Sequence, residues 1–519
     1  MSDLFQLLAS RARECPDGAL LYRGGESISN RETHDAASAT AAELRRDGVR
    51  VLAAVVSDPY ELQRWIWATR AASCALALLP VVRDPEAVQE LMDQVGAEGL
   101  VTDVESLADL ARQTGTSRDD RSSFSSSSQP AFLLQTSGTT GDGKWVAVRE
   151  DQMVTVIRAM EKAGNLRHAE DQVVFLTPPL SHSYGLSAFF EYVHAGSAVA
   201  FPQGTSPLGP AGELRRPELG ERVTAIEGVS HFYAQLSRLL ARVKLPALRH
   251  IGFGGGKIDQ DAVARFRRAF PELTYSVRYG MTETPSIVSG MTFRPPYEED
   301  GAGAGRVLPV WELRIVDEAG RPLDDGEEGE IELRGPCLAW PYYGEEEEAG
   351  DGGGGAFFPT GDLGVLSGDR LSIRGRKSLF IKHGGYRISP EDVEAVLRRF
   401  VAVSDARVFM GEEGLTAEVV GEDAGVVGED AGVVGEDAGI VGEDAGIVGE
   451  DVEPSMQALR EFAAARLPSY AVPKHWVLRT EIPRTVSGKI RRGPASDGSA
   501  QATQVTQEKT HKIKTATKP

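Results

Sequence analysis

The segment Gln135–Trp145, QTSGTTGDGKW, decides how the fold is interpreted. Its part Gly138–Lys144 matches the GxxxxGK pattern of a phosphate-cradling loop, which normally continues with Ser or Thr, whereas Trp145 follows here. A loop of that kind lies between a strand and a helix, because the helix N-terminus helps to bind phosphate. The flanking residues AFLLQ and WVAVRED are both typical of strands. The strand–loop–strand order therefore argues against a P-loop NTPase, which stays as an alternative.

The loop nevertheless carries glycines, hydroxyls and one cation. Such groups can wrap a triphosphate through backbone N–H groups, side-chain hydroxyls and an ammonium. A P-loop NTPase also needs an acidic strand, for which ELRIVDE is a weak match. However, ELRIVDE is the first part of ELRIVDEAGRPLDDGEEGEIELRG, whose alternating apolar residues on either side of a turn predict a β-hairpin. The candidate phosphate-binding residues are Thr136, Ser137, Gly138, Thr139, Thr140, Gly141 and Lys144.

Composition places the chain among globular proteins of more than one domain. It has 519 residues, of which 41% are hydrophobic and 25% charged. Its longest apolar run, about Ala71–Val82, is shorter than the ~20 residues that span a bilayer. The start of the chain lacks a secretory signal, and the three cysteines follow no metal or disulfide spacing. We therefore expect a cytoplasmic protein without a membrane partner.

The net charge of −20 does not describe the whole chain evenly. Five Gly-Glu-Asp copies between Gly421 and Asp451 supply ten of the negative charges. They belong to a seven-residue repeat, GEDAGVV, which lacks the apolar spacing of a coiled coil and the glycine spacing of a calcium-binding β-roll. We interpret it as a low-complexity insertion. The remainder is mildly acidic, so no nucleic-acid partner is expected.

Helix-like and strand-like stretches alternate from residue 1 to about 334, which predicts an α/β protein of layered sheets and helices. A Ser-rich linker interrupts them at 114–130. After IRGRKS the composition changes. SPEDVEAVLRRF then predicts a helix capped by Ser389, with Pro390 in its first position. We expect three parts: a large N-terminal α/β domain at 1–377, a small α+β domain at 378–493 with the insertion at 419–452, and a disordered tail at 494–519.

Seven motifs occur in the order typical of one family. TSGTTGDGK is followed by PPLSHSYGL, GFGGGKI, YGMTET, PTGDLG, GRKSLFIKHGGYRISPEDVE and IPRTVSGKIRR. Each alone has a common structural explanation, but chance agreement of all seven in order is implausible. The chain from the Ser-rich linker to Arg492 resembles the acyl-adenylate-forming (AMP-binding, ANL) superfamily, most closely a free-standing acyl-CoA or aryl-CoA ligase. The resemblance implies the ANL fold, with a mobile C-terminal domain.

The resemblance also implies that the chain uses ATP and Mg²⁺ to convert a carboxylic acid into acyl-AMP. Lys489 would stabilise the charge that develops at the α-phosphate. Glu283 would hold Mg²⁺, a hard cation that prefers oxygen ligands. The nucleotide contacts implied are Thr282 on the α-phosphate, Tyr279 stacked on adenine beside Gly254, Gly255, Gly256 and Gly280, and Asp362 with Arg376 at the ribose. His182 would lie near the substrate carboxylate.

The second step implied is transfer of the acyl group to coenzyme A after the small domain rotates. Gly384 and Gly385 would leave room for the pantetheine arm, with Lys382 used in this second conformation. The expected hinge is Ser378. Two departures stand out in the phosphate loop, where Gly143 replaces the family's usual proline and Trp145 its glycine.

Several alternatives stay open. Because the chain ends soon after Lys489, we expect a free-standing ligase, but the thiol acceptor can be a separate carrier protein instead of coenzyme A, or only one half-reaction can occur. A light-emitting oxygenase and a non-catalytic ATP-binding protein are weaker alternatives. The pocket walls expected, His182–Tyr184, His231–Tyr233, Phe253–Gly255 and Gly280–Ser286, favour a bulky hydrophobic or aromatic acid over acetate.

Overall fold

The computed structural model divides into two compact units. One contains Met1–Lys377 and Thr485–Lys489, and the other contains Ser378–Arg484 and Ile490–Pro519. The structure describes residues 3–113, 129–136, 143–166, 171–204, 209–285, 287–297, 303–345, 355–383, 386–400, 402–411, 414–421, 456–484 and 490–491. The repeat insertion beyond residue 421 and the expected tail lie outside the described residues, as does most of the Ser-rich linker.

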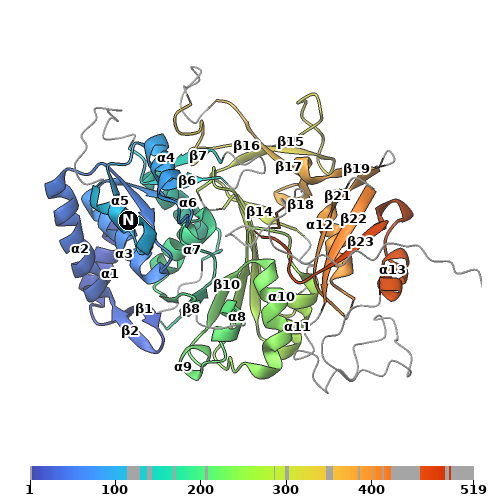
Figure 1. Ribbon diagram of the computed structural model, residues 1–519, viewed down its shortest axis with the longest axis horizontal. Helices are drawn as coiled ribbons and strands as arrows, with labels where there is room; N and C mark the ends of the chain where they lie inside the picture. Colours follow the sequence, from blue (N-terminus) through green and yellow to red (C-terminus); the bar gives the residue numbers. More distant parts are fainter. Residues whose placement is uncertain are drawn as a thin grey trace, which may run out of the picture. The chain divides into compact units, whose positions relative to one another are not determined.

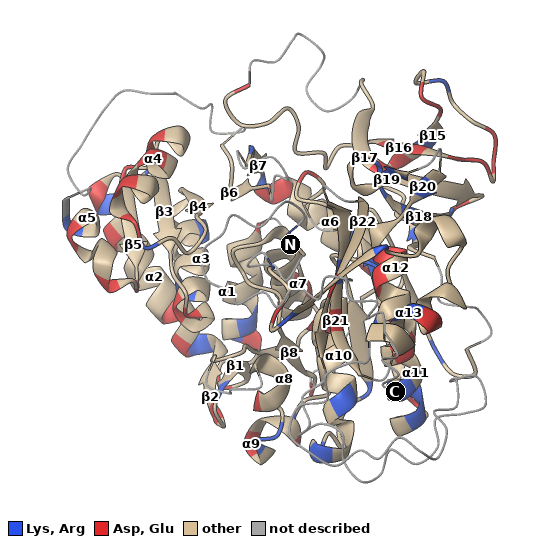
Figure 2. Cartoon of the chain, turned by 45° about the vertical axis from the view of Figure 1, so that its right-hand side comes forward, with Lys and Arg blue, Asp and Glu red and all other residues tan. Residues whose placement is uncertain are grey.

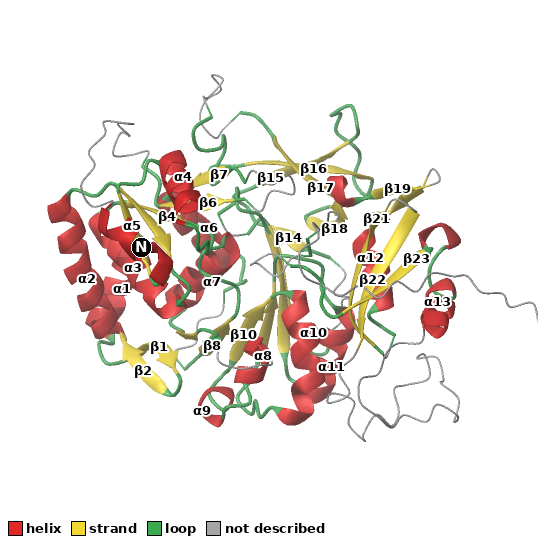
Figure 3. Ribbon diagram, in the orientation of Figure 1, coloured by secondary structure: helices red, strands yellow, loops and turns green. Residues whose placement is uncertain are grey.

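A five-stranded sheet forms the first layer of the large unit (Figures 1 and 3). Its order is β5 (Gly99–Thr102), β3 (Val51–Val55), β4 (Ala75–Leu78), β6 (Phe132–Gln135) and β7 (Trp145–Val148). The first four strands are parallel, and β7 returns antiparallel to β6. β3 and β4 are buried along their whole length, as expected for parallel strands covered on both faces.

Helices with regular N-terminal caps surround this sheet. Ser29 and Glu32 form a capping box at the start of α2, and Asp58 and Asp84 cap α3 and α4, each of which has a proline in its first turn. The helices are α1 (Leu4–Glu14), α2 (Asn30–Asp47), α3 (Pro59–Ala72), α4 (Pro85–Val95) and α5 (Ala108–Gln113). The chain then continues from β7 into α6 (Glu150–Lys162).

A thirteen-stranded sheet runs through the rest of the large unit, in the order β15-β16-β17-β18-β14-β13-β12-β11-β10-β8-β9-β1-β2. Strands β1, β9, β8, β10, β11 and β12 are parallel, and β2 and the strands from β13 onward pair antiparallel. The bounds are β1 (Ala19–Arg23), β2 (Glu26–Ser29), β8 (Val173–Leu176), β9 (Ala198–Ala200), β10 (Ala225–Gly228), β11 (His250–Phe253), β12 (Thr274–Tyr279), β13 (Ser289–Phe293), β14 (Gly305–Val307), β15 (Glu312–Val316), β16 (Glu328–Arg334), β17 (Phe358–Ser367) and β18 (Arg370–Arg376).

The two faces of the parallel strands differ in chemistry. One face is apolar and packs on α10 (Ser230–Leu239) and α11 (Gln260–Ala269), which stand beside these strands in Figure 1. On the other face, Glu227, Gly252 and Ser276 are register partners on β10, β11 and β12. Tyrosines of α7 (Ser183–His194) lie against this second face. The short helices α8 (Gly209–Glu213) and α9 (Pro217–Gly220) complete the connections.

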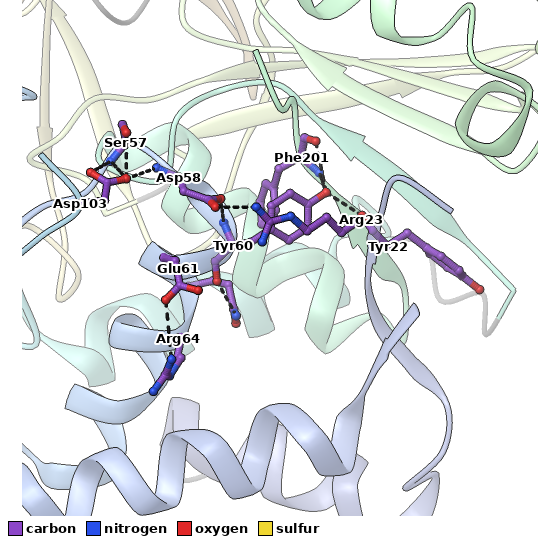
Figure 4. A network of polar contacts seen from close by, with 10 residues as sticks. Tyr22, Arg23, Ser57, Asp58, Tyr60, Glu61, Arg64, Asp103 and Phe201 are labelled. Atoms are coloured by element: carbon purple, nitrogen blue, oxygen red, sulfur yellow. Dashed lines mark hydrogen bonds and ion pairs between the residues drawn. The ribbon is translucent and has the colours of Figure 1, made fainter. Parts of the chain in front are cut away.

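A polar network joins the N-terminal end of α3 to strands of both sheets (Figure 4). Asp103, after β5, accepts hydrogen bonds from the backbone N–H groups of Ser57 and Asp58 at 2.8–2.9 Å. The Tyr60 hydroxyl donates to the Tyr22 carbonyl oxygen of β1 at 2.6 Å and accepts from the N–H of Phe201. These contacts fix the two layers of the large unit against each other.

The small unit has its own core and buried ion pairs. A three-stranded sheet, β21 (Val403–Gly411), β22 (Gly414–Gly421) and β23 (His475–Arg479), packs with α12 (Pro390–Leu397) and α13 (Met456–Ala464). Glu418 pairs with Arg407 at 2.6 Å and with Arg479 at 2.8 Å, and these groups satisfy its buried charge. A separate hairpin joins β19 (Ile381–His383) to β20 (Tyr386–Ile388).

Several local expectations are confirmed. The α/β class and the division into a large and a smaller domain match the observed architecture. The expected hairpin is β15 paired with β16, and the Ser389 side chain accepts from the N–H of Asp392 at the start of α12. In the part of the chain that Figure 2 colours, acidic and basic residues are interspersed over the helices. None of the described helices has the length and apolar character needed to cross a bilayer.

Replacing Trp67 tests the packing between α3 and α7. Its buried ring meets Phe190 edge-on, with ring centroids 5.2 Å apart, and its indole nitrogen has no hydrogen-bond partner. Trp67→Ala should lower the free energy of unfolding by about 3–5 kcal/mol because it leaves a cavity. Trp67→Phe should cost clearly less, since the ring contact is kept and no hydrogen bond is lost. Urea unfolding followed by circular dichroism checks this, and equal losses for the two variants would contradict it.

Candidate active site

The ends of the phosphate loop are closed by a hairpin. The Thr136 N–H donates to the Lys144 carbonyl oxygen at 2.8 Å, and the Lys144 N–H donates to the Thr136 hydroxyl at 3.1 Å. β6 and β7 pair antiparallel on either side, which confirms the strand–loop–strand order and contradicts the P-loop alternative. The expected phosphate ligands in the loop itself lie outside the described residues: Ser137, Gly138, Thr139, Thr140 and Gly141.

The two departures in this loop have structural reasons. A Cβ atom on Gly143 would lie 2.6 Å from the Thr136 carbonyl oxygen, so only glycine fits at the base of the hairpin. Trp145 is 5% exposed and packs in the core under α4, where its indole N–H donates to Gln94 at 2.8 Å. Trp145 is therefore a core residue, and its side chain is not available to bind phosphate.

Lys144 is surrounded by residues that the sequence analysis did not select. Its ammonium lies 4.3 Å from the centre of the Tyr342 ring and 2.9 Å from the Glu345 carboxylate. The Tyr342 hydroxyl in turn donates to Glu283 Oε1 at 2.9 Å. Burial and the adjacent Glu283 raise the pKa of Tyr342 above its usual value. A chain of contacts thus connects the loop cation with the expected magnesium ligand.

Glu283 fits the role of a magnesium ligand. It is 8% exposed, and its backbone carbonyl accepts from the N–H of Ala339, which fixes the turn. Mg²⁺ is commonly bound by one or two carboxylates together with substrate phosphates and water, so a single carboxylate is sufficient here. Within the described ranges, no three His, Cys, Asp or Glu side chains form a metal-binding cluster. Thr282, beside Glu283, is half-buried and Gly280 is exposed.

Tyr279, Asp362 and Arg376 come together although they are distant in sequence. The Tyr279 hydroxyl, at the end of β12, donates to Asp362 Oδ2 at 2.8 Å. Asp362 and Arg376 are cross-strand partners on β17 and β18, with Arg376 Nε 3.9 Å from Asp362 Oδ1. Burial and the Asp362 carboxylate keep the pKa of Tyr279 well above its usual value. Gly361, with φ of +73°, supplies the backbone turn before Asp362.

The glycine motif after β11 lies against α7. A Cβ atom on Gly254 would lie 2.5 Å from the Tyr184 ring, so the ring occupies the space of a side chain there. Gly255 has φ of +74°, whereas an added Cβ on Gly256 would meet no atom within 4 Å. His182 is the N-cap residue of α7, two residues before Tyr184. The Tyr184 side chain thus connects the histidine motif with the glycine motif.

Behind Tyr184 lies a buried polar cluster that no motif indicated. The Tyr184 hydroxyl lies 2.7 Å from Glu227 Oε1, and the Tyr192 hydroxyl donates to Glu227 Oε2 at 2.6 Å. Arg278 pairs with Glu191 and lies 3.5 Å from Glu227. Although burial opposes the charge, the two glutamates raise the pKa of Arg278 well above its usual value. The feature of the sequence that could have indicated this cluster is Glu227, a carboxylate within the short apolar strand AIEG.

The remaining candidates are in the small unit and in the segment Thr485–Lys489, which is grouped with the large unit. Arg484 and Ile490, which flank the segment containing Lys489 in the sequence, form a β-bridge, and Arg407 donates to the Arg491 carbonyl oxygen at 2.8 Å. Lys382 lies exposed on β19. Lys489, Gly384 and Gly385 lie outside the described residues, so their roles stay predictions. The chain passes from the large to the small unit between Lys377 and Ser378, and the hinge role of Ser378 also stays a prediction.

The sequence is similar to a family of AMP-binding enzymes and to individual CoA ligases. Residues 8–343 match the model of the family described as AMP-binding enzyme. A 2-succinylbenzoate–CoA ligase from Bacillus licheniformis is 32% identical over 366 residues, which are 70% of this chain and 69% of that protein. A 2-succinylbenzoate–CoA ligase from Bacillus subtilis is 29% identical over 370 residues, 71% of this chain and 68% of that protein.

Solved structures show the same fold over nearly the whole chain. The O-succinylbenzoate coenzyme A synthetase from Bacillus subtilis in complex with AMP has a TM-score of 0.72 at 24% identity, covering 95% of this chain and 98% of that one. The anthranilate CoA ligase AuaEII in complex with anthranoyl-AMP has a TM-score of 0.74 at 17% identity, covering 94% and 95%.

Restoring the common loop residue at position 145 tests the assignment of Trp145 to the core. Trp145→Gly should lower the free energy of unfolding by about 3–5 kcal/mol, because a buried indole is removed. Trp145→Phe should lose less, since the ring is kept and only the Gln94 contact is lost. Thermal and urea unfolding measure both variants. A Trp145→Gly variant as stable as the parent protein would show that the side chain contributes nothing to the core.

Proposed function

The chain belongs to the AMP-binding enzyme family, and on this premise we propose that it is an AMP-forming acyl-CoA ligase. It uses ATP to activate a small-molecule carboxylic acid and transfers the acyl group to coenzyme A. The resemblance to the acyl-adenylate-forming superfamily and the expected ANL fold are confirmed by the comparisons above. The observation that supports the proposal most strongly is the placement of Asp362 beside Tyr279 and Arg376 at the end of β12.

In the first step a carboxylate oxygen attacks the α-phosphorus of ATP, and the bond to pyrophosphate breaks. The acid is already ionised at neutral pH, so the step needs no general base. The obstacle is the approach of one anion to another, and catalysis is therefore electrostatic and positional. Lys144 lies at the end of the loop for the leaving pyrophosphate, and Lys489 stabilises the charge at the α-phosphate. Glu283 would hold Mg²⁺, which would supply positive charge to neutralise the phosphates.

The nucleoside is held by groups on β12, β17 and β18. A carboxylate oxygen pair offers about four lone-pair positions, so Asp362 can accept from ribose hydroxyls as well as from Tyr279. Arg376 fixes the orientation of this carboxylate from the neighbouring strand. The Tyr279 ring takes its stacking role with its hydroxyl already engaged by Asp362. Adenine then lies beside Gly255 and Gly256, where the backbone leaves room.

The second step exchanges AMP for a thiol. The thiolate sulfur attacks the acyl carbon, a thioester bond forms, and AMP leaves with the electrons of the anhydride bond. Lys382 and the glycines Gly384 and Gly385 serve this step after rotation of the small domain about Ser378. The relatives named as CoA ligases favour coenzyme A as the acceptor. A cytoplasmic location is part of the proposal, and the three cysteines are free thiols.

Acid-dependent exchange of pyrophosphate into ATP tests the first step. A panel of aryl, fatty and polycyclic acids together with 2-succinylbenzoate should contain acids that support exchange. Lys489→Ala should lower the exchange rate by about a hundredfold or more, because a transition-state contact is lost. Lys474→Ala, which changes an exposed lysine of the small unit, serves as the control and should behave like the parent protein.

The same reaction separates the alternatives. Thioester formation with coenzyme A supports the proposed ligase, whereas transfer only to a phosphopantetheine-bearing carrier protein identifies a carrier-loading enzyme. Exchange without either product identifies an enzyme of one half-reaction. Absence of exchange with every acid, while AMP still binds, contradicts the proposal and favours a non-catalytic nucleotide-binding protein.

The ribose contacts can be tested by AMP binding in isothermal titration calorimetry. Asp362→Asn removes a charged acceptor and should weaken AMP binding by about 10-fold or more, since hydrogen bonds to charged groups contribute about 1.5–3 kcal/mol. Tyr279→Phe keeps the ring and loses only the hydroxyl, so its effect should be clearly smaller. Unchanged AMP affinity in Asp362→Asn would remove Asp362 from the nucleotide site.

A further inference from the structure

The cluster behind Tyr184 has an unusual balance of charge for a buried site. Glu227 and Glu191 are both 0% exposed, and the Arg278 guanidinium pairs with Glu191 and lies 3.5 Å from Glu227. Buried carboxylates are rare unless they are paired, because removing their charge from water is unfavourable. His250, on the same face of the sheet, lies against the hydroxyls of Thr274 and Ser276. The cluster is therefore rich in hydrogen-bond acceptors.

Two glycines make room for this cluster. A Cβ atom on Gly252 would lie 2.1 Å from Glu227 Oε2, and one on Gly254 would lie 2.5 Å from the Tyr184 ring. No other residue fits at either position without moving these side chains. Gly252 lies in β11 and Gly254 directly after it, beside the ends of β10 and β12, where parallel α/β sheets bind their ligands. The cluster thus lies at the edge of the sheet that carries the nucleotide groups.

Tyr184 determines what the cluster presents to a ligand. Its side chain is only partly buried, whereas Glu227 behind it is fully buried. The single hydroxyl proton of Tyr184 has two partners, Glu227 Oε1 at 2.7 Å and the Gly228 carbonyl oxygen at 3.3 Å, and both are acceptors. With this proton engaged, the phenol oxygen can only accept from a ligand. A ligand group that donates hydrogen bonds is favoured, and a second carboxylate is disfavoured.

We propose that Glu227, acting with Tyr184, is a specificity-determining residue that selects a monocarboxylic acid bearing an amino group. This inference rests on the proposed function, since it concerns the acid that is adenylated. The amino group of the acid donates to the Tyr184 oxygen and lies in the field of the Glu227 carboxylate. The sequence led us to expect a bulky hydrophobic or aromatic acid. The polar site restricts that class to acids that also carry an amino group.

Matched sets of acids test the selection. One set is 4-aminobutanoate, pentanoate and glutarate, which differ only in the terminal group. The other comprises the 2-, 3- and 4-isomers of aminobenzoate, methylbenzoate and carboxybenzoate. In pyrophosphate exchange, the best amino-substituted acid of a set should have a kcat/KM at least about tenfold above that of the acid with a methyl group in the same position. The dicarboxylic acid should have the lowest kcat/KM. The factor corresponds to one hydrogen bond involving a charged group.

Substitutions then assign the preference to the cluster. Glu227→Gln keeps the size of the side chain and removes its charge, while Arg278 retains Glu191. It should lower kcat/KM for the amino acid by about 10- to 100-fold, mainly through KM, and change that for the methyl acid by less than about threefold. Tyr192→Phe, which removes the contact with Glu227 Oε2, is the control and should keep the preference.

Stable acyl-sulfamoyl adenosine analogues give a readout without turnover. They are made from the amino-substituted, methyl-substituted and dicarboxylic acids of one set. The amino analogue should raise the melting temperature of the parent protein most, and Glu227→Gln should lose this difference. Equal loss of activity with all acids in Glu227→Gln would assign it a purely structural role and overturn the proposal. Preference of the parent protein for the methyl or dicarboxylic acids would overturn it while leaving the ligase function intact. No exchange and no stabilisation with any acid or analogue would overturn both.

Discussion

The hydrogen bond from Tyr279 to Asp362 is the contact on which the arrangement of the large unit depends. Tyr279 ends the last parallel strand of the thirteen-stranded sheet, whereas Asp362 lies in its antiparallel extension. The two residues are 83 positions apart in sequence. A parallel sheet gathers its ligand groups at the carboxyl ends of its strands. This contact brings a carboxylate from the antiparallel part to that edge, so the proposed nucleotide site is shared by both kinds of sheet.

Short-range patterns predicted much of the fold. Three predictions that depend on residues close together in sequence are observed. They are the strand WVAV, the hairpin that begins at residue 312 and the Ser389 cap. Trp145 shows the limit of such reasoning. Its position in a phosphate-loop motif indicated an altered loop, but its environment is set by Gln94 on α4, 51 residues away.

The polar cluster could not be predicted for the same physical reason. Glu227 on β10 and Arg278 on β12 contact each other and the α7 residues Glu191, Tyr184 and Tyr192, so these contacts join elements that are distant in sequence. No local rule identifies a carboxylate in a buried strand as satisfied or functional, because burial and pairing are tertiary properties. By contrast, the motif residues around Glu283 were found from sequence, although their neighbours Tyr342 and Glu345 were not.

The space left at Gly252 has a consequence for how this protein can diverge. Any side chain at position 252 collides with the Glu227 carboxylate, so the two positions are energetically coupled and their substitutions do not add. A side chain at position 252 requires the Glu227 carboxylate to move, so a change at Gly252 costs less once Glu227 has become a smaller residue. An order of substitution in which Glu227 changes before Gly252 is therefore favoured.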